Sequence, residues 1–173
     1  MLTSDQRGAA AELAVMHHAA RLGVGVLRPV TDGHRYDLAF DVGGERLLRV
    51  QCKSATLDED VVVVRCRSCR RSNDGFVRRP YTSDEVDLVA AYCFELDRSY
   101  LLPPELFSGR TAIQLRLSPA KNNQRSRINW AKDFEFAATL PAYRAGAIAQ
   151  LGERVHGMHE VAGSSPAGST LFP

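Results

Sequence analysis

The feature that most constrains the fold is a pair of short apolar segments, residues 35–42 and 46–53, separated by Gly43-Gly44. Glycine adopts positive φ angles at little cost, so a Gly-Gly pair between two such segments predicts a β-hairpin. The hairpin in turn fixes which side chains of the two strands lie close together. The side chains of this predicted hairpin are therefore the first candidates for a functional site.

Three polar residues interrupt the apolar pattern of the hairpin, namely Asp37, Gln51 and Lys53. Side chains two residues apart leave a strand on the same face, so Gln51 and Lys53 point the same way, and strand pairing brings Asp37 near them. A carboxylate beside a lysine on paired strands is most often a simple cross-strand ion pair. However, the segment 47–53 is apolar enough for a central strand, where burying an ammonium group is costly. The pattern therefore favours a functional patch.

The hairpin resembles the active-site hairpin of the PD-(D/E)xK nuclease superfamily, with Asp37 as the first acid and Gln51-Cys52-Lys53 in place of the (D/E)xK element. Glutamine in place of an acid resembles the variant in group I intron-encoded homing endonucleases, whose strand carries QxK. The segment from Gln6 to Glu12 resembles the Gln-x-Gly-x-x-x-Glu helix opening of those nucleases. Later positions that fit their pattern are Tyr81, Asp87, Tyr100 followed by Pro103, Leu115-Arg116-Leu117, Asn122-Asn123, Ile128, Ala131 and Asp133. The resemblance covers about residues 6–136.

The resemblance implies a site for a divalent cation, Mg²⁺ or Mn²⁺. Asp37, the side-chain oxygen of Gln51 and the backbone carbonyl of Cys52 would be its ligands, and Glu12 would bind a coordinated water or a second ion. Lys53 would orient the attacking water or stabilise the developing negative charge. Mg²⁺ prefers such oxygen ligands. Because Gln51 replaces an acid, we expect weaker metal affinity than at a site with three acids.

The rest of the chain predicts one long helix followed mainly by strands. The helix begins at a Thr3 or Ser4 cap, with Gln6 as capping-box partner, and runs to about Arg21 before Gly23. Strands are expected at 24–29, 61–64, 87–95, 100–102 and 113–117, short helices at 103–107 and 128–134, and loops at 56–60, 65–79 and 118–127. This order predicts an α/β or α+β fold with a mixed sheet and flanking helices. The resemblance specifies a restriction-endonuclease-like core in a domain of residues 1–138, with 139–173 as a poorly ordered tail.

Positive charge is concentrated in two stretches of the chain, residues 61–80 and 108–132. Any single basic stretch is usually a solvated face. Two basic stretches, next to an acidic N-terminal part that could bind a metal ion, favour a protein that binds a polyanion. We expect this polyanion to be double-stranded DNA. Loop arginines usually contact phosphates rather than bases. The candidate DNA-binding residues are Arg65, Arg67, Arg70, Arg71, Arg78, Arg79, Arg116, Lys121, Arg125 and Arg127.

The sequence has neither a membrane-spanning segment nor a signal peptide pattern, which bears on the cellular compartment and on the state of the cysteines. No apolar run reaches membrane-spanning length and the first residues lack a signal-peptide layout, so a cytoplasmic protein is expected. The four cysteines are then expected to be free thiols. Cys66 and Cys69 form a lone CxxC without a second ligand pair, which disfavours structural zinc. His17 and His18 are interpreted as helix-face residues rather than ligands.

The tail from Gly146 onward is rich in Gly, Ser, Ala and Pro. Residues 148–154 can be encoded by ATA GCT CAG TTG GGA GAG CGN, which resembles the D arm of a transfer RNA gene, and residues 163–166 by GGT TCG AGT CCN, which resembles a T arm. We expect the reading frame to run through a tRNA gene, as suits a mobile element at such a locus. A genuine amphipathic helix with a disordered end is the alternative, and the codons decide between them.

These features together predict a metal-dependent DNA endonuclease, of the homing type. The alternatives are a Holliday-junction-resolvase-like nuclease, a catalytically inactive DNA-binding module of the same fold, and a plain α/β domain with solvent-facing basic loops. Cleaving two strands calls for two active sites, so a homodimer or homotetramer is expected.

Overall fold

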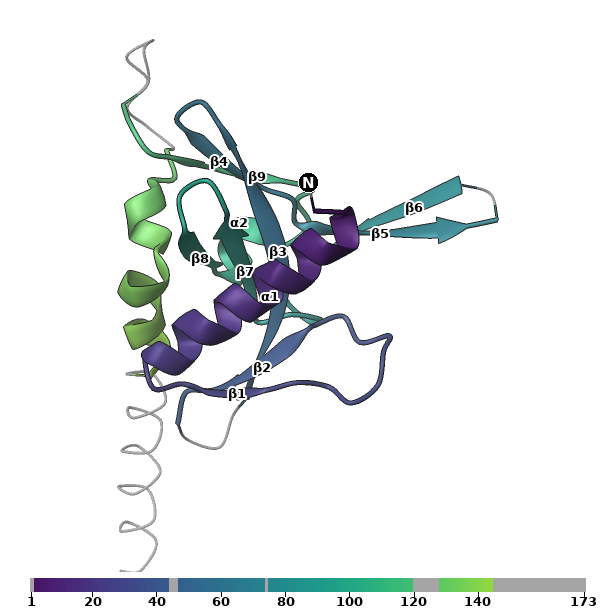
Figure 1. Ribbon diagram of the computed structural model, residues 1–173, viewed down its shortest axis with the longest axis horizontal. Coiled ribbons are helices and arrows are strands. Elements are labelled where there is room, and N and C mark those ends of the chain that lie inside the picture. The colour runs from purple at the N-terminus through teal and green to yellow at the C-terminus, as the bar shows by residue number, and fades with distance from the viewer. Residues whose placement is uncertain (1, 44–46, 74, 120–127, 145–173) are drawn as a thin grey trace, which may run out of the picture.

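The computed structural model describes residues 2–43, 47–73, 75–119 and 128–144. The elements in chain order are α1 (Ser4–Arg21), β1 (Gly25–Leu27), β2 (Leu38–Asp41), β3 (Leu47–Asp58), β4 (Val61–Val64), β5 (Arg67–Ser72), β6 (Gly75–Pro80), β7 (Leu88–Cys93), β8 (Arg98–Leu102), α2 (Pro104–Phe107), β9 (Ile113–Arg116) and the 3₁₀ helix η1 (Ala131–Phe134). Residues 136–144 are also helical. Figure 1 shows the long helix α1 crossing the sheet and the β5–β6 hairpin projecting from the body.

The sheet is organised around β3, which is long enough to pair with different strands along its length. Its first half pairs antiparallel with β2 and parallel with β7, and its last residues pair antiparallel with β4. The strand order is β1-β2-β3-β4-β9, and β7 joins β3 to β8 outside that path. The sheet is therefore mixed, as expected for an α+β fold.

Two apolar clusters lie on opposite faces of this sheet. Along β7, Leu88 and Ala90 belong to the cluster beneath α1, whereas Val89 and Ala91 belong to the other. This alternation is the period-2 signature of a strand buried on both faces. Of the two faces, α1 covers the first with its buried residues Ala11, Val15 and Ala19. Glu12, next to Ala11, thereby lies at the margin of the helix–sheet contact.

The ends of α1 match the sequence prediction. The Thr3 side chain accepts a hydrogen bond from the Gln6 N–H at 3.2 Å, and the Gln6 side chain accepts one from the Thr3 N–H at 3.0 Å. This capping box satisfies backbone donors that the first helical turn leaves unpaired. After the helix, Gly23 has a φ of +71°, the left-handed conformation that favours glycine.

The prediction of a loop over residues 65–79 is wrong. This stretch forms the two-stranded hairpin β5–β6, here called the arm, with Cys69 opposite Arg78 and Ser72 opposite Gly75. A turn closes it at Gly75, whose φ is +119°. Most of the described side chains of the arm are exposed, among them Phe76 at 68% and Val77 at 57%. A ribbon with so little buried surface has no apolar alternation, which is why the pattern looked like a loop.

Two smaller boundaries also differ from the sequence predictions. Residues 56–58, expected in a loop, continue β3 and turn back at Glu59, whose φ is +48°. Helical residues 136–144 continue past the domain boundary expected at 138, and they place Leu140 in the core beneath α1. The tRNA-like part of the tail, residues 146–173, lies outside the described residues. None of the helices in the described ranges combines the length and hydrophobicity that crossing a bilayer requires.

Candidate active site

The site is built around Asp37, the residue directly before the start of β2. The Asp37 N–H still donates to the Val50 carbonyl at 3.0 Å. Its carboxylate then continues the pairing with β3, because Oδ2 accepts a hydrogen bond from the Cys52 N–H of that strand at 2.8 Å. The end of one strand therefore holds an acid directly against the backbone of its neighbour.

The Gln51 side chain closes the group. Its amide Nε2 donates to Asp37 Oδ2 and also to the Cys52 carbonyl, the latter at 3.2 Å. Gln51 is only 6% exposed, so this amide is shielded from bulk water. Two oxygen atoms, one charged and one from the backbone, thus converge on a single buried donor.

This arrangement fits a divalent cation. Rotating the Gln51 amide by half a turn replaces the nitrogen by Oε1, so that three oxygens face one another without a donor among them. Such an oxygen set suits Mg²⁺ or Mn²⁺. Within the described part of the chain, no three His, Cys, Asp or Glu side chains gather into a metal-ligating group. A cation here would therefore rely on the Gln51 amide and the Cys52 carbonyl as well as on Asp37.

Electrostatics link four charged side chains around this point. Burial raises the pKa of the Asp37 carboxyl above its usual value. Four nearby groups lower this pKa without outweighing burial: the Cys52 N–H, the Lys53 charge, the Gln51 amide and the Arg28 charge. The Gln51 amide contacts the Asp37 carboxylate, and Lys53 leaves β3 on the same face as Gln51, so Asp37 and Lys53 lie on the same side of the sheet.

Glu12 reaches this patch from α1. Burial raises its pKa, and the negative charge of Asp37 raises it further, while Arg28 and Lys53 oppose both. Its carboxylate also forms an ion pair with the Arg28 guanidinium at 3.3 Å, and the Glu12 side chain is 25% exposed. Glu12 is therefore near enough to sense the charges of Asp37 and Lys53, but its direct ionic partner is Arg28.

Two residues of the site were not among the candidates taken from the sequence. Arg28 follows β1, and pairing of that strand with β2 was the available signal that it lies near the acids. Tyr81 was noted only as a position that fits the family pattern; it lies just after β6, and its ring centroid is 5.1 Å from Lys53 Nζ. Its proximity to Lys53 depends on the tertiary fold alone.

The candidate DNA-binding residues fall into separate groups. Arg65, Arg67, Arg70, Arg71, Arg78 and Arg79 lie on the arm or directly before it. Arg116 is in β9, and its Nε is buried without a hydrogen-bond partner in the described residues. Lys121, Arg125 and Arg127 lie outside the described residues. Arg79 pairs with Glu85 at 2.5 Å, so it is held at the root of the arm.

The cysteines and the helix histidines are not part of the site's ligand set. All four thiols are free, and burial raises the pKa of Cys66 to about 12, which keeps that thiol protonated. Cys52 contributes its backbone, and burial raises the pKa of its thiol as well. His18 contacts the Ser99 hydroxyl at 2.7 Å and packs near Phe136, which is a structural role at the far end of α1.

Comparison with known proteins confirms the expected restriction-endonuclease-like fold. The sequence matches the PD-(D/E)XK endonuclease family over residues 2–137. The structure of the bacterial homing endonuclease I-Ssp6803I is similar to this one, with a TM-score of 0.67 and 32% sequence identity, over 84% of this chain and 97% of that chain. No curated protein matched the sequence.

Proposed function

The chain belongs to the PD-(D/E)XK endonuclease family, and from this premise we propose that it hydrolyses DNA phosphodiester bonds with the help of Mg²⁺ or Mn²⁺. The observation that carries the proposal is the convergence of the Asp37 carboxylate and the Cys52 carbonyl on the Gln51 amide. These are oxygen ligands of the type that hard divalent cations prefer. A cation bound there would polarise the scissile phosphate and lower the pKa of a water nucleophile.

The other charged residues have distinct proposed roles. The Lys53 ammonium orients the attacking water or donates hydrogen bonds to the phosphate oxygens as negative charge develops on them. Glu12 is a further oxygen ligand once it is released from Arg28, which pairs with it at 3.3 Å. Arg28 then becomes available to a DNA phosphate, because a guanidinium and a phosphate form strong charge-assisted hydrogen bonds.

The arm is the proposed main DNA contact. Its candidate arginines belong to a two-stranded antiparallel ribbon, and a ribbon of this kind fits the major groove of B-form DNA. This changes the expectation from sequence, in which the same arginines sat on a loop and contacted phosphates only. On a ribbon, some of them reach base edges while others, nearer the root, neutralise the backbone.

A homing role is proposed from the similarity to the bacterial homing endonuclease. The described residues hold a single candidate site, so cutting both strands of a duplex requires at least two copies. We therefore keep a homodimer or homotetramer in the proposal, because closed symmetric assemblies are the usual way to pair identical sites.

The test is a cleavage assay on DNA from the chain's own genomic neighbourhood, with and without Mg²⁺ or Mn²⁺. Asp37→Ala and Lys53→Ala should abolish cleavage while DNA binding stays near the parent value. Matched controls are Asp58→Ala, an exposed acid on β3, and Lys132→Ala, an exposed lysine in η1. Both controls should cleave like the parent. Robust cleavage by both site variants would end the assignment.

The same assay separates the alternatives. Preference for a four-way junction over linear duplex would identify a junction resolvase with the same chemistry. Binding with a steep salt dependence but no cleavage in any divalent metal would identify an inactive DNA-binding module. Failure to retain DNA at physiological salt would leave a domain whose basic residues only face solvent.

A further inference from the structure

The Lys53 ammonium is held in an unusual way for a charged group in a partly buried site. It makes no hydrogen bond or ion pair with any residue that the structure describes. Its short-range partner is the ring of Tyr81, whose centroid lies 5.1 Å from Nζ. An ammonium at this distance from an aromatic ring is attracted by the negative charge on the ring face.

The Tyr81 ring is fixed in place on several sides. The side chain is 3% exposed and belongs to the apolar cluster on the face of the sheet away from α1. The Tyr81 N–H donates to the Cys66 carbonyl at 3.2 Å, and its carbonyl accepts from the Gly109 N–H at 3.0 Å. No described residue forms a hydrogen bond with the Tyr81 hydroxyl. The ring therefore acts through its face, and its orientation does not depend on the hydroxyl.

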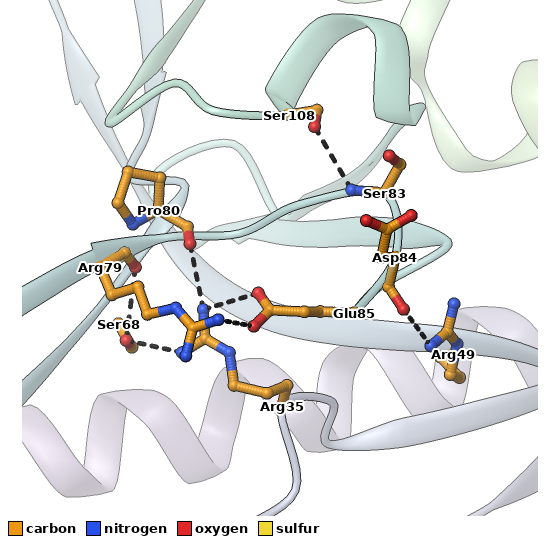
Figure 2. A network of polar contacts seen from close by, with 9 residues as sticks. All are labelled: Arg35, Arg49, Ser68, Arg79, Pro80, Ser83, Asp84, Glu85 and Ser108. Atoms are coloured by element: carbon orange, nitrogen blue, oxygen red, sulfur yellow. Dashed lines mark hydrogen bonds and ion pairs between the residues drawn. The ribbon is translucent and has the colours of Figure 1, made fainter.

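A second cation fixes the ring from the root of the arm. The Arg35 guanidinium carbon lies 4.5 Å from the Tyr81 centroid. As Figure 2 shows, this guanidinium donates to the Ser68 hydroxyl at 2.8 Å, to the Pro80 carbonyl at 3.1 Å and to Glu85 at 3.0 Å. Glu85 balances the positive charge of Arg35 locally. The same ring thus contacts the Arg35 guanidinium, which is hydrogen-bonded at the base of the arm, and the Lys53 ammonium, which has no hydrogen-bond or ion-pair partner among the described residues.

We infer that Tyr81 is a positioning residue for Lys53. A ring face keeps the ammonium beside Asp37 without using any of its three N–H donors. An ion pair with Asp37 would instead occupy a donor of the lysine and an oxygen of the proposed metal ligand. The ring therefore leaves both groups available for water and phosphate. The inference rests on the proposed nuclease function and adds the residue that keeps its lysine ready.

Substitutions at Tyr81 have distinct expected effects. Tyr81→Phe keeps the ring face and should keep the single-turnover cleavage rate within about twofold of the parent. Tyr81→Leu removes the ring and should lower that rate about tenfold, in line with the strength of a shielded cation–π contact, with unchanged DNA affinity. Phe107→Leu is the matched control, because Phe107 is a fully buried aromatic of the same cluster and contacts no cation in the described structure. It should lose stability but not the cleavage rate.

A graded series separates ring electrostatics from packing. Phenylalanine carrying one, two or three fluorines at position 81 changes ring shape little but weakens the negative charge on its face stepwise. The logarithm of the cleavage rate should fall with each added fluorine. A flat series would overturn the inference, because a purely structural role depends on shape.

A measurement without catalysis tests the contact itself. The chain has three lysines, Lys53, Lys121 and Lys132, so ¹³C-lysine labelling of the full chain gives few side-chain signals, and Lys53→Arg assigns the one of interest. The Lys53 ε-proton signal should be shifted upfield by the ring current in the parent and in Tyr81→Phe, and the shift should vanish in Tyr81→Leu. An unshifted parent signal overturns the inference. If the shift is present but the parent cleaves no DNA, the proposed function fails while the Tyr81–Lys53 contact stands.

Discussion

Replacing Gln51 by glutamate restores the acid of the usual (D/E)xK pattern, and its effect follows from the geometry. In the parent, the Gln51 amide donates to Asp37 Oδ2 and to the Cys52 carbonyl. In Gln51→Glu, an oxygen replaces that nitrogen, so both hydrogen bonds are lost and a second carboxylate faces the first. Without metal, we therefore expect the variant to be less stable than the parent.

The magnitude is set by two limits. Two unit charges about 4 Å apart repel by about 4 kcal/mol at an effective dielectric constant of about 20. The new carboxyl can avoid this repulsion by binding a proton, which at neutral pH costs about 3.7 kcal/mol for a group with a reference pKa of about 4.3. We expect a loss of about 3–4 kcal/mol in the free energy of unfolding at neutral pH. Because the folded state raises the pKa of the new group, the loss is absent below about pH 4 and grows as pH rises above that reference value.

Under the proposed function, Mg²⁺ should reverse the effect. Both carboxylates would become ligands of the cation, and each tenfold gain in affinity would add about 1.4 kcal/mol of stability under saturating metal. Urea unfolding followed by the fluorescence of Trp130, the one tryptophan of the chain, measures these differences at two pH values with and without Mg²⁺. Gln51→Met is the control, since it removes the amide and adds no charge, so neither pH nor Mg²⁺ should rescue it. Metal-free stability equal to that of the parent at neutral pH would refute the convergence of Asp37 and residue 51.

Two further predictions concern the cations around the site. Glu85→Gln should lower the free energy of unfolding by about 1–3 kcal/mol at neutral pH, since it leaves the partly buried Arg35 guanidinium without its counter-charge. Burial tends to raise the pKa of Glu85, but the hydrogen bond and charge of Arg35, together with Arg79, outweigh it and lower that pKa, so urea melts should show the difference from the parent disappearing as pH falls through the lowered pKa. Arg28→Met should raise the pKa of Glu12 further, since the Arg28 charge now opposes burial and Asp37; a carboxyl-carbon NMR titration that leaves this pKa unchanged would contradict the placement of Arg28.

A structural feature can be predicted from the sequence when the residues that form it are close together along the chain. The capping box at Thr3 and Gln6 and the hairpin at Gly43 follow from backbone rules that act over a few residues, and the structure has both. The placement of Gln51 and Lys53 on the same face of their strand is equally local, because it depends only on their two-residue spacing. Together with the resemblance, these features place Asp37 against β3, which is the core of the candidate site.

The arm shows where such reasoning fails. Burial patterns identify strands only when one face is apolar, and neither strand of the arm packs on the body along its length. Its hydrogen bonds between β5 and β6 satisfy the backbone without a core. A basic composition without alternation is equally typical of a loop, so only the tertiary structure distinguishes the two.

The same distinction explains why Tyr81 and Arg28 emerged only from the structure. Each acts on a charged residue far away in the sequence, Tyr81 on Lys53 and Arg28 on Glu12. The site has fewer negative charges than a three-acid site, since Gln51 is neutral, and the Arg28 charge offsets one of its two acids. Asp37 is therefore held by the Gln51 amide, Glu12 by Arg28, and Lys53 by the Tyr81 ring. Under the proposed function, the first two contacts would give way to a cation and a phosphate, whereas the ring would keep the lysine in place.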